Sequence, residues 1–389
     1  MRRRTFLKMA AFIFVLPFTA MIARPSDYYI YPNGSDVNGD GSRAHPWLTV
    51  THADRSGKLR PGDTVHVAPG NYTGPWRTWN TSGTAAAPIT YVSTTKWGAV
   101  LHSTTSASVW SNKANYIEIV NFVVVGNGQS KNGVYTSGAN TVIRGNEVHG
   151  VLEGPYSAAT CNTIGGAGIQ LDGPDALVVG NYVHNNGPHD SSGNPVYCNY
   201  VHGIYFLRPG GLAANNMSFD NAGWGIQMWH WASHEVINNN TIFNNGVGCI
   251  VVGASDNGTI DDGTVVDNNI CYKTHRGIGE RGMYGPGKYA TGPHNIYHHN
   301  LLYDNSVYAF SLQTGTQSHT VWADPQFINY TGTASGNCHL SSVSPAIEKG
   351  LSSDTIPQGS TVFFAPYDFF GVKRPQGCCF DLGAIEYVP

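Results

Sequence analysis

Residues 215–253 read NNMSFDNAGWGIQMWHWASHEVINNNTIFNNGVGCIVVG and contain two copies of each of two short phrases. The first phrase, Asn215-Asn216-Met217-Ser218, returns as Asn239-Asn240-Thr241-Ile242. The second phrase, Gly225-Ile226-Gln227, returns as Cys249-Ile250-Val251. Apolar residues two positions apart, bounded by Gly and Asn, are typical of short strands rather than helices. The stretch therefore predicts coils of strands that repeat along the chain.

Both phrases recur outside this stretch. The further copies of the Asn phrase are Val120-Asn121-Phe122-Val123, Gly145-Asn146-Glu147-Val148, Gly180-Asn181-Tyr182-Val183, Asn268-Asn269-Ile270-Cys271 and His299-Asn300-Leu301-Leu302. The further copies of the Gly-Ile phrase are Gly133-Val134-Tyr135, Gly168-Ile169-Gln170, Gly203-Ile204-Tyr205, Gly277-Ile278-Gly279 and Ala309-Phe310-Ser311. This pattern predicts an all-β right-handed parallel β-helix in which the Asn residues stack as a buried ladder.

Composition restricts the partners of the protein. The 389 residues include 47 Gly, and only 12% are charged, which fits many tight turns around a long core. The net charge is −3, and leaving out Arg2, Arg3, Arg4 and Lys8 lowers it to −7. We therefore expect no nucleic-acid partner.

The N-terminus predicts export. Arg3-Arg4-Thr5-Phe6-Leu7-Lys8 precedes an apolar run at residues 9–21 that is too short to span a bilayer. The pattern resembles a bacterial twin-arginine signal and predicts a secreted or periplasmic protein without stable membrane association, although a retained anchor stays open. The predicted regions are the signal at 1–23, an N-terminal cap with first coils at 24–113, regular coils at 114–322, and a segment at 323–389 that closes the far end.

Seven cysteines in an exported chain indicate disulfides. Cys161 and Cys198 lie in insertions before the Gly-Ile phrases of successive coils and are the best predicted pair. Cys338 is a candidate partner of Cys378 or Cys379. Cys249 and Cys271 fall in different columns of the repeat, which predicts two core thiols.

The two ends of the mature chain resemble a known superfamily. The N-terminal part contains Tyr28-Tyr29-Ile30-Tyr31-Pro32-Asn33-Gly34-Ser35-Asp36 and Pro61-Gly62-Asp63, and the C-terminal part contains Asp381-Leu382-Gly383-Ala384-Ile385-Glu386-Tyr387. These motifs are similar to those of pectate-lyase-like β-helix proteins. The resemblance implies the same fold, but that superfamily includes lyases, hydrolases, epimerases and proteins without catalytic activity.

One face of the predicted solenoid carries the candidate binding residues. If each Ile of the Gly-Ile phrase points inward, the next residue and the one two positions further point outward. The resulting aromatic, amide and charged side chains predict a groove for an acidic polysaccharide, with substrate-binding candidates Gln170, Asp172, Tyr205, Trp224, Gln227, Trp229 and His230. Insertions at residues 152–165 and 187–200, and a basic segment at 273–288, are expected to form the walls.

The predicted reaction is β-elimination from a uronate, which needs a base, a group that neutralises the carboxylate, and an acid. Lyases of the resembling superfamily use Lys or Arg as the base, which implies Lys273 for this role. Arg276 and Arg281 are then candidates for carboxylate or leaving-group contacts, and His202 is an alternative acid or base. No cofactor is required, Ca²⁺ is left open, and neither His230 with His234 nor the cluster of His294, His298 and His299 predicts a metal site.

Two alternatives remain at the level of sequence. A glycoside hydrolase needs two carboxylates across the scissile bond, and the candidates Asp172 and Glu280, on the same set of strand columns but three coils apart, are predicted to lie about 14 Å from each other. A non-catalytic carbohydrate-binding protein would use the same groove without a base. The capped ends of a solenoid favour a monomer.

Overall fold

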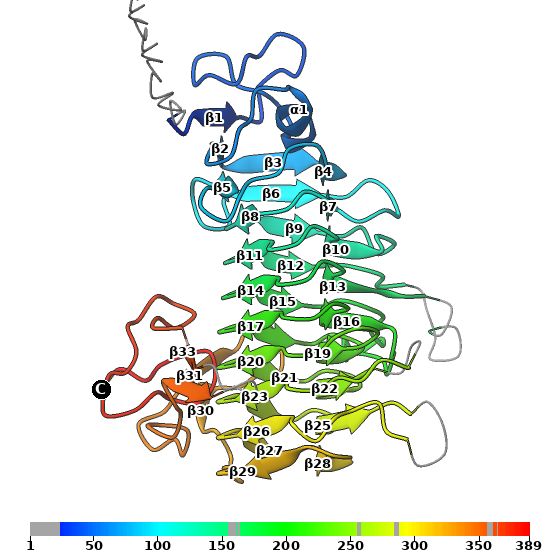
Figure 1. The fold of residues 1–389 in the computed structure, drawn as a ribbon, viewed down its shortest axis with the longest axis vertical. Coiled ribbons are helices and arrows are strands. Elements are labelled where there is room, and N and C mark those ends of the chain that lie inside the picture. Colours follow the sequence, from blue (N-terminus) through cyan, green and yellow to red (C-terminus); the bar gives the residue numbers. More distant parts are fainter. Residues whose placement is uncertain are drawn as a thin grey trace, which may run out of the picture.

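The chain winds into coils, each of which contributes one strand to each of three parallel sheets (Figure 1). The structure is a computed structural model that describes residues 24–154, 161, 164–254, 258–283, 288–355, 361–363 and 365–389. The predicted signal at 1–23 lies outside the described residues. Within the described part, no helix has the length and apolarity needed to cross a bilayer.

Sheet I contains, in spatial order, β1 (Asp27–Ile30), β2 (Thr64–Val67), β5 (Ile89–Ser93), β8 (Ile117–Val120), β11 (Val142–Arg144), β14 (Leu177–Val179), β17 (Leu212–Ala214), β20 (Val236–Asn238), β23 (Val265–Asp267), β26 (Ile296–His298) and β29 (Thr316–Ser318). Sheet II contains β3 (Gly70–Thr73), β6 (Ala99–His102), β9 (Val123–Val125), β12 (Glu147–His149), β15 (Tyr182–His184), β18 (Met217–Phe219), β21 (Thr241–Phe243), β24 (Ile270–Tyr272) and β27 (Leu301–Tyr303).

Sheet III is formed by the Gly-Ile phrases and contains β4 (Trp76–Thr78), β7 (Trp110–Asn112), β10 (Asn132–Thr136), β13 (Gly166–Leu171), β16 (Val201–Phe206), β19 (Trp224–Met228), β22 (Gly248–Gly253), β25 (Arg276–Arg281) and β28 (Tyr308–Ser311). The inward residues Ile169, Ile204, Ile226, Ile250 and Ile278 are in register from coil to coil and fully buried. The right-handed parallel β-helix is therefore confirmed, and so is the predicted alternation of inward and outward residues.

The Asn ladder lies at the corner between sheets I and II. Each buried member except the last donates from Nδ2 to Oδ1 of the next member at 2.9–3.1 Å, in the order Asn146, Asn181, Asn216, Asn240, Asn269 and Asn300. Asn121 is not a member of the ladder, so the first copy of the Asn phrase is shifted by one residue relative to the others. Phe122 occupies the ladder position of its coil, and its backbone N–H donates to Asn146 Oδ1 at 2.9 Å. Asn121 instead has a φ of 67° in the left-handed region, which Asn tolerates at turns.

The two ends of the solenoid are built differently. Near the N-terminus, α1 (Val50–Arg55) is capped by the Thr49 side chain, which accepts from the His52 N–H. The C-terminal segment does not extend over the far end. It runs back along the flank of the coils and includes the hairpins β30 (Phe327–Asn329) with β31 (Asn337–Leu340), and β32 (Ser353–Thr355) with β33 (Thr361–Phe363) (Figure 1).

This return path covers apolar side chains that sheet II presents outward. Phe219 and Phe243 stack at 4.6 Å between ring centroids, and Tyr330 from the C-terminal segment packs edge-on against Phe243 at 5.5 Å. Leu382 and Ala384 are buried in the same cluster. Removal of this apolar surface from water is favourable, so the segment lies along the coils instead of beyond them.

The cysteines form two disulfides among the described residues. The predicted Cys161–Cys198 bond is confirmed, with 5.5 Å between the Cα atoms, and it joins the two insertions. Cys249 and Cys271 are also bonded, which corrects the prediction of core thiols. They lie on different sheets but both point into the core, so their side chains meet across the coil.

The predicted link from Cys338 to Cys378 or Cys379 is wrong. Cys338 is buried in the apolar cluster of the C-terminal segment, where burial raises the pKa of its thiol to about 12. Cys378 is exposed, with its Sγ 2.9 Å from that of Cys379. Cys338 is thus buried in the apolar cluster, whereas Cys378 and Cys379 lie together nearer the surface. All three thiols are free.

Candidate functional site

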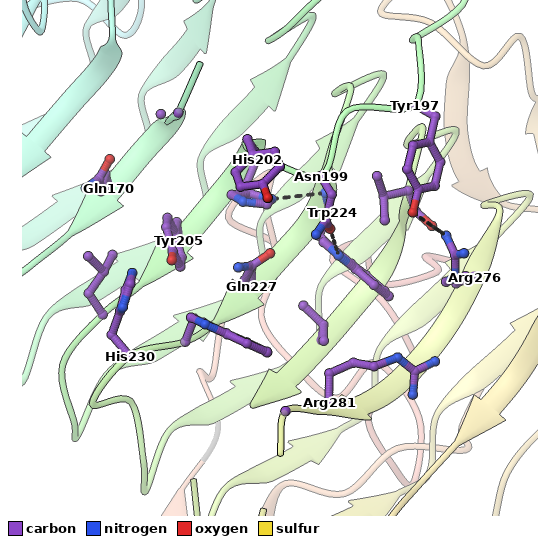
Figure 2. A pocket seen from close by; sticks show the side chains of 18 of the residues that line it. Gln170, Tyr197, Asn199, His202, Tyr205, Trp224, Gln227, His230, Arg276 and Arg281 are labelled. Atoms are coloured by element: carbon purple, nitrogen blue, oxygen red, sulfur yellow. Dashed lines mark hydrogen bonds between the residues drawn. The ribbon is translucent and has the colours of Figure 1, made fainter. Parts of the chain in front are cut away.

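A groove of about 700 Å³ crosses the outer face of sheet III (Figure 2). Its lining includes nine residues predicted from the sequence: Gln170, His202, Tyr205, Trp224, Gln227, Trp229, His230, Arg276 and Arg281. They come together because the outward columns are in register, with Tyr205 beside Gln227 and Gln227 beside Val251. The structure thus confirms that these side chains share one face.

The groove continues toward the N-terminal coils. A second cavity of about 530 Å³ is lined by Arg77, Trp79, Tyr135 and Asp172, and it shares Lys131 and Gln170 with the first. The two cavities therefore form an extended depression along the solenoid axis. An elongated site of this kind suits an extended ligand better than a small molecule.

Glycines on one strand make room for the tryptophans of the preceding coil. A Cβ atom on Gly248 would lie 2.4 Å from the Trp224 ring, and one on Gly253 would lie 2.6 Å from the Trp229 ring. Trp224 is only 4% exposed, and its indole N–H donates to Asn199 Oδ1 at 2.8 Å. Trp224 therefore fills the floor, whereas the partly exposed Trp229 presents more ring surface to the groove.

The insertion at 187–200 forms a wall, as predicted. Tyr197, Asn199 and Tyr200 line the groove from this loop, and the neighbouring Cys198 is fixed by its disulfide to Cys161. Sequence reasoning predicted the wall but did not identify these side chains, because a loop of this length has no periodicity that orients them. Most of the predicted insertion at 152–165 lies outside the described residues.

Two arginines on β25 lie at opposite edges of the groove. The Arg276 guanidinium lies 5.3 Å from the Tyr197 ring centroid and donates to Tyr197 Oη at 3.3 Å. The Arg281 guanidinium donates to Tyr308 Oη at 2.6 Å and to Ser311 Oγ at 3.1 Å. These contacts hold the two cations in place without neutralising them, and Figure 2 shows the contact between Arg276 and Tyr197.

Among the described residues, the charged side chains of the main cavity have one sign, whereas Asp172 lines the second cavity. The described residues that line the main cavity include Lys131, Arg276 and Arg281 but neither Asp nor Glu. This lining contrasts with the net charge of −3 for the whole chain. A concave surface with positive charge concentrates anions near it.

His202 is a neutral imidazole. It is 2% exposed, and burial lowers its pKa to about 3. The backbone N–H of Trp224 donates to His202 Nδ1 at 3.3 Å, so the ring proton is assigned to Nε2. His202 is therefore suited to donate a hydrogen bond rather than to accept a proton at neutral pH.

Lys273 lies outside the groove. It occupies the turn between β24 and β25 with a φ of 49°, and its Nζ is 5.3 Å from the ring centroids of both Tyr272 and Tyr330. The left-handed turn directs its side chain toward the C-terminal segment. This placement separates the predicted base from Arg276 and Arg281.

The predicted carboxylates do not face each other. Asp172 lies in the second cavity, where its Oδ1 pairs with Arg208 at 2.8 Å. Glu280 points into the core and is fully buried, two residues after the inward Ile278, so it does not reach the groove. Its carboxylate accepts hydrogen bonds from the backbone N–H groups of Gln313 at 2.6 Å and Thr314 at 2.7 Å. Glu280 therefore provides the acceptor for two buried backbone donors in the turn after β28.

Comparisons with known proteins agree with this architecture. A family model described as "Right handed beta helix region" matches residues 107–278. The structure is similar to that of pectate lyase Pel9A, with a TM-score of 0.58, 17% identity, and coverage of 93% of this chain and 96% of that one. A structure named only as a glycoside hydrolase gives a TM-score of 0.50 at 8% identity, covering 76% of this chain and 96% of that one.

An alginate lyase from Paenibacillus sp. strain FPU-7 gives a TM-score of 0.49 at 14% identity, covering 76% of this chain and 99% of that one. A search of curated protein sequences found no significant match. At these identities the likenesses show the fold alone. The chain therefore has the right-handed parallel β-helix fold, and its residues 107–278 match the model of that fold.

Proposed function

We propose that the protein is an exported polysaccharide lyase that cleaves a uronate-containing chain by β-elimination in the groove over sheet III. The observation that carries this proposal is the positively charged lining of the main cavity, in which Arg276 and Arg281 lie beside aromatic side chains and no described lining residue is a carboxylate. The fold shared with pectate lyase Pel9A supports the same reaction class. The two disulfides fit an oxidising compartment outside the cytoplasm.

The arginines supply the electrostatic part of the reaction. Abstraction of the C5 proton leaves negative charge that spreads onto the uronate carboxylate, and a guanidinium paired with that carboxylate stabilises the charge. Arg276 and Arg281 project from the two ends of β25, so they would contact a sugar bound across this strand. An arginine stays protonated in proteins, so neither is assigned as the base.

Tyr197 is the proposed proton-transfer group. Its phenol oxygen accepts a hydrogen bond from Arg276 at 3.3 Å, which places it close to the C5 atom of a uronate whose carboxylate binds that arginine. As the phenolate, Tyr197 would take the C5 proton, a double bond would form between C4 and C5 as the C4–O4 bond breaks, and the departing O4 would take that proton from the Tyr197 phenol, which returns to the phenolate. His202 would donate from Nε2 to a substrate oxygen.

The alternatives are less well supported. A hydrolase of the two-carboxylate type needs a pair of acidic groups at the bond, and Asp172 is instead paired with Arg208 while Glu280 is buried. A protein that only binds carbohydrate would need the groove but no proton-transfer group. Product formation separates this possibility from a lyase.

The test is ultraviolet absorbance during incubation of the purified protein with pectate, alginate, glucuronan and glycosaminoglycans, with and without Ca²⁺. The expected result is a rise in absorbance from the unsaturated uronate product on one of these polymers. Arg281→Ala and Tyr197→Phe should each lower kcat/KM by about 100-fold, whereas Tyr303→Phe on sheet II should not. Binding without any product would contradict the lyase, and release of reducing sugar without absorbance would indicate a hydrolase.

A further inference from the structure

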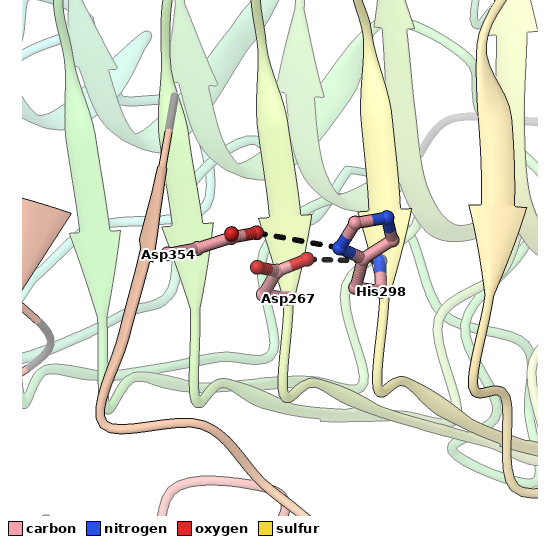
Figure 3. Close-up of side chains that lie close together, drawn as sticks. All are labelled: Asp267, His298 and Asp354. Atoms are coloured by element: carbon pink, nitrogen blue, oxygen red, sulfur yellow. Dashed lines mark hydrogen bonds and ion pairs between the residues drawn. The ribbon is translucent and has the colours of Figure 1, made fainter. Parts of the chain in front are cut away.

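Three side chains from distant parts of the chain meet on the outer face of sheet I, away from the groove. Asp267 ends β23, His298 ends the adjacent β26, and Asp354 lies in β32 of the C-terminal segment (Figure 3). One ligand atom from each residue lies within 4.8 Å of the others. The C-terminal segment thus completes a cluster that sheet I only begins.

The environment of Asp267 is unusual for a carboxylate. The residue is fully buried, and its Oδ1 accepts the backbone N–H of His298 at 2.8 Å. Its Oδ2 atom is also buried and has no hydrogen-bond partner among the described residues. No Lys or Arg among the described residues forms an ion pair with Asp267. A buried carboxylate oxygen without a partner is costly, so a ligand for this atom is expected.

The carboxyl groups of Asp267 and Asp354 lie close together, with their ligand atoms within 4.8 Å of each other. Two carboxyl groups this close either share a proton or hold a cation between them. The distance between His298 and Asp354 favours a bound cation over a shared proton.

The His298 Nδ1 and Asp354 Oδ2 atoms are 3.3 Å apart. This distance is long for a charge-assisted hydrogen bond, which is typically about 2.7–2.9 Å. Two ligands of one tetrahedral ion, each bonded at about 2.1 Å, lie roughly 3.4 Å apart. The His298 and Asp354 side chains are 28% and 17% exposed, which leaves a path for an ion from solvent.

We propose that Asp267, His298 and Asp354 bind one divalent transition-metal cation, with Zn²⁺ as the representative ion. Imidazole nitrogen with two carboxylates suits Zn²⁺ better than Ca²⁺, which prefers an all-oxygen set. Water completes the coordination on the exposed side. The ion ties the C-terminal segment to sheet I, so its role is structural and independent of the proposed lyase activity.

The test uses the full mature chain after chelator treatment. Zn²⁺ should bind with a stoichiometry of one in calorimetry and should raise the melting temperature by about 3 °C at 100-fold excess over its Kd. Asp354→Asn, on the C-terminal segment, should abolish both effects without unfolding the coils. The matched control is Asp262→Asn, which removes a carboxylate that pairs with the exposed His294 at 2.8 Å and should leave Zn²⁺ binding unchanged.

The exposed thiols of Cys378 and Cys379 are a competing Zn²⁺ site, so a Cys378→Ser, Cys379→Ser variant is included. It should retain the tight site, and Co²⁺ bound to it should lack the charge-transfer absorption of thiolate ligands. Absence of Zn²⁺ binding, or equal binding by the Asp354→Asn variant, would overturn the proposal. The first of these results would leave Asp267 and Asp354 as a carboxyl pair that shares a proton.

Discussion

Asn240 illustrates how a single ladder residue supports several coils. Its Oδ1 accepts from both the backbone N–H and the side-chain amide of Asn216 at 3.0 Å, and its Nδ2 donates to Ala213 O at 2.9 Å. Asn240→Ala leaves two buried donors of Asn216 without an acceptor. Each unpaired buried group costs about 1–3 kcal/mol, so we expect a loss of roughly 3 kcal/mol in the free energy of unfolding.

Urea unfolding measures this change, and Asn33→Ala at an exposed turn is the matched control. Equal midpoints for the two variants would show that the ladder contributes little. The hydrogen bonds of the ladder would then orient the coils without adding to the free energy of unfolding.

At the scale of elements, the corner between sheets III and I contains buried acids. Glu235, Asp261 and Glu280 are all fully buried, and the Thr264 hydroxyl lies 3.0 Å from Glu235 Oε2 and 2.7 Å from Asp261 Oδ1. Burial raises the pKa of Glu235 to about 8, and burial followed by the charge of Glu235 raises the pKa of Asp261. The neutral form of Glu235 and Asp261 is therefore the one that fits the fold.

This corner predicts the direction of a pH effect. Because the folded pKa of Glu235 exceeds its unfolded value of about 4.5, its contribution to stability is complete below that pH and is lost as pH rises toward 8. Melting temperatures across this range should fall, and Glu235→Gln should flatten the slope. The partly exposed Glu118→Gln is the control. An unchanged slope in Glu235→Gln would contradict the assignment of this effect to Glu235.

At the scale of the whole molecule, Arg374 joins the C-terminal segment to the coils. Its guanidinium is buried, pairs with Glu386 at 2.8 Å, and donates to Asn215 Oδ1 of the solenoid at 3.3 Å. Arg374→Met leaves the buried Glu386 carboxylate unpaired, so we expect a loss of about 3–5 kcal/mol in the free energy of unfolding. Limited proteolysis should then cleave within residues 323–389 before the coils, whereas the exposed Lys373→Met should behave like the unsubstituted protein. Equal protease resistance in both variants would contradict this role of Arg374.

Most of the groove was predictable because it depends on local periodicity. Once Ile204 and Ile226 point inward, alternation along a strand fixes the outward direction of Tyr205 and Gln227, and parallel register places them side by side. The same alternation places Glu280 inward, two residues after Ile278, and backbone N–H groups of a later turn satisfy its carboxylate there. The role of Lys273 rested on the resemblance alone, and alternation could not orient this left-handed turn residue.

The sequence alone determined the parallel β-helix, the Asn ladder from Asn146 onward and the face that carries the groove, because these features repeat over one coil and depend on near neighbours. Tertiary structure decided what comes from distant parts of the chain: the Cys249–Cys271 bond across a coil, the Tyr197 contact with Arg276, and the return of the C-terminal segment along sheets I and II. The meeting of Asp267, His298 and Asp354 is of this second kind. Residues so far apart in sequence meet only when apolar burial has docked the segment, and no local pattern encodes that contact.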